Sequence, residues 1–97
     1  MIDRQQYIDV LIAAGDFAHG GRPEFVAVQW MAEGFSPKET KKWLEARCFD
    51  AAAARKMVAV GITPEEAVRS YGNDTIGYAV ANMDLTITQA RELLNQL

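Results

Sequence analysis

Two corners of this chain share a pattern that stops one helix and starts the next. They read Gly34-Phe35-Ser36-Pro37-Lys38-Glu39 and Gly61-Ile62-Thr63-Pro64-Glu65-Glu66. A glycine after an apolar helical run ends a helix in the left-handed conformation. The hydroxyl residue and the glutamate three positions later can then form a capping box, with proline at the first helical position. A chain with such corners is expected to fold as a series of short helices.

Similar signals occur elsewhere in the chain. Asp3 and Thr86 each precede a Gln by three positions, Gly15 follows an apolar helical pattern, and a weaker corner lies at Cys48-Phe49-Asp50. We therefore predict an all-α fold, a compact bundle of six or seven short helices with no strand. The expected helices cover about 4–14, 23–33, 37–47, 51–60, 64–71, 75–83 and 87–96. Around Gly72 the sequence allows either a turn or a kink between two helices.

The length of the chain fits one folding unit. Ninety-seven residues are expected to form a single domain over 1–97, because one core usually takes about 100–150 residues. Large side chains recur at Trp30, Trp43, Met57 and Tyr71, with spacings of 13, 14 and 14 residues. We expect these four side chains at the centre of the molecule. Solenoid repeats are longer, about 20–50 residues, so a globular bundle is favoured.

The segment 29–54 carries a family resemblance. It runs from Gln29-Trp30-Met31-Ala32-Glu33-Gly34-Phe35 through the capped segment 36–44 to Phe49-Asp50-Ala51-Ala52-Ala53-Ala54. This run resembles ubiquitin-associated (UBA) domains, in which a Met-Gly-Phe loop precedes a capped helix and a third helix follows. Here the loop reads Glu-Gly-Phe, so the methionine that such loops present to ubiquitin is absent. The Gly-apolar-Ser/Thr-Pro phrase is also similar to short helical repeats of bacterial and phage proteins.

The sequence offers little for catalysis or for holding a cofactor. His19, in a glycine-rich connection, is the only histidine, and Cys48 is the only cysteine. We expect an exposed loop histidine and a buried inert thiol rather than a Cys–His pair. The start Gly20-Gly21-Arg22-Pro23 lacks the Walker pattern for phosphate, and no zinc or calcium spacing is present. We therefore predict no enzyme activity, no cofactor and no metal.

Composition places the chain in a general class. It is 49% apolar and 24% charged, the balance of a soluble globular protein. No apolar run approaches the ~20 residues that cross a bilayer, and a single cysteine fits a reducing compartment. We expect a cytoplasmic monomer or homodimer that makes no contact with a membrane.

Charge is unevenly distributed along the chain. Residues 1–35 carry two basic and five acidic side chains, residues 36–60 six and three, and residues 61–97 two and five. On the helix expected at 37–47, Lys38, Lys41 and Lys42 fall on one face with Glu45, and Trp43 turns toward the core. The candidate partner-binding residues are these three lysines together with Glu65, Glu66 and Asp74. Whether the basic island 38–56 or the acidic ends of the chain form the binding surface is left open.

These features favour a non-enzymatic protein-binding module. Because both ends are acidic, the sharper hypothesis is a small phage or mobile-element inhibitor, similar in size and charge to anti-CRISPR proteins, that covers a basic, nucleic-acid-handling surface of its partner. The alternative is a small DNA-binding regulator of the helix-turn-helix type. It would use the basic region or the corner from Thr63 to Asn82, although the helix expected at 75–83 contains no Arg or Lys.

Overall fold

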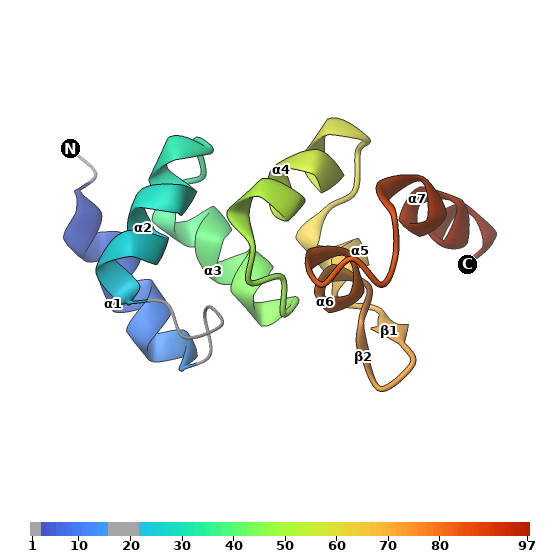
Figure 1. Cartoon of the computed structure of the whole chain (residues 1–97), viewed down its shortest axis with the longest axis horizontal. Coiled ribbons are helices and arrows are strands. Elements are labelled where there is room, and N and C mark those ends of the chain that lie inside the picture. The colour runs from blue at the N-terminus through green and yellow to red at the C-terminus, as the bar shows by residue number, and fades with distance from the viewer. Residues whose placement is uncertain (1–2, 16–21) are drawn as a thin grey trace.

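The computed structural model describes residues 3–15 and 22–97, and it confirms an all-α architecture (Figure 1). Within these residues the helices are α1 (Arg4–Ala14), α2 (Pro23–Ala32), α3 (Pro37–Glu45), α4 (Ala51–Ala59), α5 (Pro64–Ala67), α6 (Ile76–Ala81) and α7 (Ile87–Gln96). Two strands, β1 (Ser70–Tyr71) and β2 (Asp74–Thr75), lie between α5 and α6. None of the helices in these two described ranges is long and apolar enough to cross a membrane.

The predicted capping residues begin the helices. At α3 the Ser36 hydroxyl accepts a hydrogen bond from the Glu39 amide at 3.1 Å, and the Glu39 carboxylate accepts one from the Ser36 amide at 2.8 Å. Equivalent boxes start α1, α5 and α7. Gly15, Gly34 and Gly61 have φ of 78°, 83° and 79°, the left-handed conformation that glycine adopts without strain. The corners therefore work as the sequence predicts.

A two-stranded hairpin replaces part of two predicted helices. The helix expected over 64–71 ends at Ala67, and the one expected over 75–83 covers only Ile76–Ala81. Between them Ser70 pairs with Thr75 and Tyr71 with Asp74 in antiparallel register. The expectation of no strand was wrong because Gly72, with φ +61°, occupies the first position of a two-residue loop, a common hairpin geometry.

Aromatic residues of α2, α3 and the corner between them form the first part of the core. Trp30 and Trp43 are fully buried, and each packs edge-on against Phe35, with ring centroids 5.3 and 6.3 Å apart. The Tyr7 hydroxyl donates a hydrogen bond of 2.5 Å to the Phe35 carbonyl, which ties α1 to this corner. The core continues without interruption to Leu94 in α7.

The expected central side chains are correctly placed except for one. Trp30, Trp43 and Met57 are buried, whereas Tyr71 is 38% exposed. Tyr71 lies in β1, beside the hairpin loop, so it never reaches the position that a continuous helix would have given it. The change from helix to hairpin therefore explains this error.

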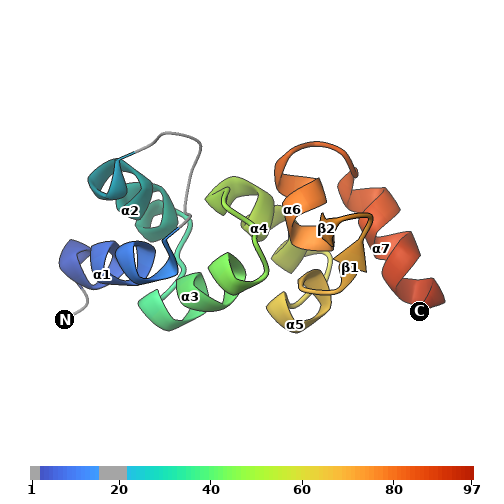
Figure 2. The same cartoon turned by 90° about the horizontal axis from the view of Figure 1, so that it is seen from below.

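The molecule measures 39 × 25 × 17 Å. Its helices follow one another along the longest of these axes. Figures 1 and 2 show α1 and α2 at one end, α3 and α4 in the middle, and α7 at the other end. Helix α1 packs against α2 and α3. This order places α3 between the end formed by α1 and α2 and the end formed by α7.

Candidate functional site

Helix α3 presents the charged face that its spacing predicts. Thr40, Trp43 and Leu44 are buried, and the opposite side exposes Lys38, Lys41, Lys42 and Glu45. The four exposed residues are called the α3 face below. The buried Thr40 hydroxyl donates to the Ser36 carbonyl at 2.9 Å, so no polar group of this side chain is left unpaired.

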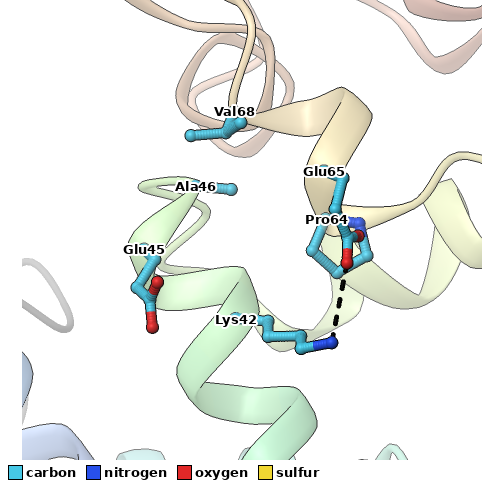
Figure 3. Close-up of a pocket in the computed structure, with 6 residues that line it drawn as sticks. All are labelled: Lys42, Glu45, Ala46, Pro64, Glu65 and Val68. Atoms are coloured by element: carbon cyan, nitrogen blue, oxygen red, sulfur yellow. Dashed lines mark ion pairs between the residues drawn. The ribbon is translucent and has the colours of Figure 1, made fainter.

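Among the hollows that border the α3 face, two lie on either side of Glu45. One lies toward α5 and is lined by Lys42, Glu45, Ala46, Pro64, Glu65 and Val68, as Figure 3 shows. The other lies toward α1 and is lined by Asp9, Val10, Ala13, Ala14, Lys41 and Glu45. Glu45 borders both, which makes α3 a charged ridge between two mainly apolar depressions.

The basic segment 36–60 and the acidic segment 61–97 meet at the first hollow. The Lys42 ammonium lies 3.5 Å from the Glu65 carboxylate, across the mouth of the hollow (Figure 3). Their side chains are 50% and 68% exposed, and an ion pair so exposed contributes only about 0–1 kcal/mol. The pair can therefore open without much loss when another molecule binds.

The other two candidate carboxylates are engaged within the chain. Glu66 completes the cap of α5 and lies 3.6 Å from the Arg91 guanidinium of α7. Asp74 accepts a 2.7 Å hydrogen bond from Arg47. Of the three acidic candidates, Glu65 is thus the one most available to a partner.

Arg47 organises a cluster that the sequence analysis did not identify. Its guanidinium lies over the rings of Phe49 and Tyr78, 5.4 and 5.3 Å from their centroids, and it also bonds Asp74. Arg47 has φ of 60°, which ends α3 without a glycine. The signal in the sequence was an Arg two residues before an aromatic, but its partners on the hairpin and α6 are about 30 positions away.

The corner from Thr63 to Asn82 does not form two adjoining helices. Helix α5 has four residues, the hairpin follows, and α6 buries Ile76, Gly77, Ala79 and Val80 of its six residues. A recognition helix must present its side chains to the major groove. Here most of the α6 surface is packed inside the protein.

Of the two residues considered for catalysis, the structure describes only Cys48. Cys48 is buried, its thiol donates to the Asp50 carbonyl at 3.5 Å, and burial raises its pKa to about 12. His19 and the glycines at 20 and 21 lie outside the described residues. Within residues 3–15 and 22–97 no group of three His, Cys, Asp or Glu side chains is arranged to hold a metal ion.

Comparisons with known proteins give no relative. No protein-family model, curated protein or solved structure matches this chain. The resemblance of residues 29–54 to UBA domains therefore stays a prediction, carried by the end of α2, by α3 and by the start of α4.

Proposed function

We propose that the protein is a non-enzymatic protein-binding module whose partner contacts the α3 face and the hollow between α3 and α5. The observation that carries this proposal is the combination of an exposed apolar side chain, Val68, with an easily opened ion pair beside it. Val68 is 47% exposed, and Pro64 and Ala46 form the adjoining apolar wall.

Both parts of this hollow can contribute to binding. An apolar side chain of the partner that covers Val68 gains about 25 cal/mol for each Å² removed from water. Rim charges contribute chiefly to the rate and orientation of encounter, because they stay partly solvated. Lys38, Lys41, Lys42 and Glu45 are in this position, and opening the Lys42–Glu65 pair frees one charge of each sign.

The partner that fits best carries basic side chains opposite α5 and acidic side chains opposite Lys38, Lys41 and Lys42 of the α3 face. The chain has a net charge of -3, and the segment 61–97, which includes α5, accounts for an excess of three carboxylates. The sharper form of the proposal is therefore a small phage or mobile-element inhibitor that covers a basic, nucleic-acid-handling surface, in the manner of anti-CRISPR proteins.

The test compares surface variants in a pull-down from a bacterial host lysate, followed by binding to the purified partner. We expect the wild-type chain to recover a basic, nucleic-acid-handling protein, and Glu65→Lys and Val68→Glu to lose it. The matched control is Glu92→Lys on α7, which makes the same charge change at an exposed position away from α3. Recovery that is unaffected by Glu65→Lys and Val68→Glu would reject this surface.

Direct DNA binding is tested separately. A gel-shift titration at two salt concentrations distinguishes it, because phosphate contacts make affinity fall steeply as salt rises. Under the proposed function we expect no salt-sensitive shift with duplex DNA. A steep salt dependence that is lost when Lys38, Lys41 and Lys42 are replaced would favour the DNA-binding alternative.

A further inference from the structure

Helix α2 is apolar on two opposite sides. Its inner side buries Val26, Ala27 and Trp30 in the core. Its outer side exposes Phe25 and Val28, which are 68% and 47% accessible to solvent. A contiguous apolar face that remains exposed marks an interaction surface in a soluble protein. A second contact that covers the outer side would account for apolar side chains on both sides of this helix.

The outer face has an ordered pattern along the helix. At 100° per residue, Phe25, Val28 and Ala32 lie within one arc of about 60°. Arg22, at the start of the helix, and Glu33, at its end, are eleven residues apart, close to three full turns. They therefore border the same edge of the apolar face, one at each end. In the described parts of the chain, neither side chain takes part in any of the ion pairs that the fold contains.

This arrangement of charge is self-complementary in one orientation. When two copies of a helix pack antiparallel around a two-fold axis, the same edge of each helix meets, with its ends reversed. Arg22 then faces Glu33 of the partner subunit, and the contact occurs twice. In a parallel arrangement around a two-fold axis, the edge that carries Arg22 and Glu33 would face the opposite edge of the partner's helix. Only the antiparallel arrangement therefore brings Arg22 against Glu33 of the partner subunit.

We propose that the outer face of α2 is a self-association surface, on which a second copy of this chain packs antiparallel with reciprocal Arg22–Glu33 ion pairs. Phe25 and Val28 form its apolar centre. One ten-residue helix covers less area than the roughly 800 Å² per partner of a standard stable interface. The dimer is therefore weak and forms at high protein concentration.

The experiment is sedimentation equilibrium at low ionic strength, up to about 1 mM protein, where even an association with a millimolar Kd is half formed. We expect the wild-type chain to dimerise. Arg22→Glu and Glu33→Arg should each weaken dimerisation about tenfold or more, since each places like charges opposite each other. Phe25→Glu should abolish it. The matched controls Arg69→Glu and Glu92→Arg make the same charge changes at exposed positions elsewhere, and Met83→Glu likewise replaces an exposed apolar side chain by a glutamate. All three should leave the dimer intact.

Mixing the two charge variants tests the orientation directly. In a heterodimer of Arg22→Glu with Glu33→Arg, both reciprocal contacts join opposite charges. We expect this mixture to associate more tightly than either variant alone, and the double variant Arg22→Glu/Glu33→Arg to regain wild-type dimerisation. Circular dichroism first establishes that each variant is folded. A wild-type chain that stays monomeric up to about 1 mM, or a mixture no tighter than its components, would overturn the proposal.

Discussion

At the scale of single residues, Gly77 makes the closest approach to neighbouring backbone of all the glycines in the described ranges. A Cβ atom at this position would lie 2.8 Å from the carbonyl oxygen of Ala46 and 3.3 Å from the Cβ of Cys48. Helix propensity alone favours alanine over glycine by about 1 kcal/mol. The contact reverses this preference, because backbone cannot move aside as a flexible side chain can.

We therefore predict that Gly77→Ala destabilises the fold by about 1–3 kcal/mol, the usual cost of overpacking. Gly72→Ala serves as the comparison, because Gly72 has open space around it and only a positive φ to maintain. Thermal unfolding should show a lower Tm for Gly77→Ala than for Gly72→Ala. A Gly77→Ala protein as stable as the wild type would mean that a Cβ atom at position 77 does not meet the Ala46 carbonyl oxygen.

Cys48 gives the protein a specific response to alkaline pH. Burial raises the pKa of its thiol to about 12 from the ordinary value of 9.0. Above the ordinary pKa the unfolded chain loses this proton and the folded chain keeps it. The free energy of unfolding therefore falls as pH rises through this window, at up to about 1.4 kcal/mol per pH unit.

Denaturant unfolding at about pH 8 and about pH 10 checks this. Between these two pH values we expect Cys48 to lower the free energy of unfolding by about 1.5 kcal/mol. The Cys48→Ala variant isolates the contribution, since the pKa of Tyr7 is also raised by burial and by the nearby Glu39 and adds to the fall at higher pH. Equal pH dependence in the wild type and Cys48→Ala would show that the thiol is accessible to water in the folded state.

At the scale of secondary structure elements, Thr75 joins the end of α3 to the start of α6. Its hydroxyl donates to the Ala46 carbonyl at 2.6 Å and accepts from the Tyr78 amide at 3.0 Å. Valine has the same shape but neither hydrogen bond. A valine would leave the Tyr78 amide and the Ala46 carbonyl without their hydrogen bonds to residue 75, at a combined cost of about 2 kcal/mol.

We predict that Thr75→Val lowers the free energy of unfolding by about this amount, whereas Thr75→Ser, which keeps the hydroxyl, costs less than half as much. Urea unfolding of the two variants measures the difference. Similar losses for serine and valine would assign the effect to the methyl group and its packing.

Elements with local chemical signals were predictable from the sequence, and elements without them were not. The starts of α3, α5 and α7 follow from a hydroxyl residue and a Glu or Gln three positions later, all within one helical turn. The strands β1 and β2 have two residues each, too few to show an alternating pattern. The sequence also did not reveal which side of α2 faces outward, because the exposed Phe25 and Val28 fit helical spacing as well as the buried Val26 and Trp30 do.

At the scale of the whole molecule, one core runs through all the helices of the described ranges, from Tyr7 in α1 to Leu94 in α7. Tryptophan fluorescence reports only part of this core, since Trp30 and Trp43 lie in α2 and α3. Far-UV circular dichroism reports every helix. If the shared core makes folding cooperative, both signals measure the same transition.

We predict coincident unfolding midpoints for tryptophan fluorescence and circular dichroism in denaturant, together with a shift of the tryptophan emission to longer wavelength on unfolding. The same two probes on a Leu94→Ala variant should shift together, because the cavity left in α7 destabilises the common core. A circular dichroism transition that separates from the fluorescence transition would divide the molecule into two folding units.

The candidate site shows the limit of reading charge from a sequence. The faces of α3 follow from spacing within one helix, so Lys38, Lys41 and Lys42 were correctly placed outside and Trp43 inside. The pairing of Lys42 with Glu65, and of Arg47 with Asp74, joins residues 23 and 27 positions apart. Such pairs depend on how helices pack, which no local pattern specifies.

The enclosure of Cys48 also has a practical consequence for anyone who studies this protein. A thiol that is fully covered and protonated at neutral pH reacts slowly with maleimides and other alkylating reagents. A cysteine introduced at a solvent-facing position such as Met83, which is 90% exposed, would then be the one group that takes up a fluorophore or a crosslinker. The native residue can stay in place, and labels attached beside the α3 face or along α2 can report which of the two surfaces becomes covered in a complex.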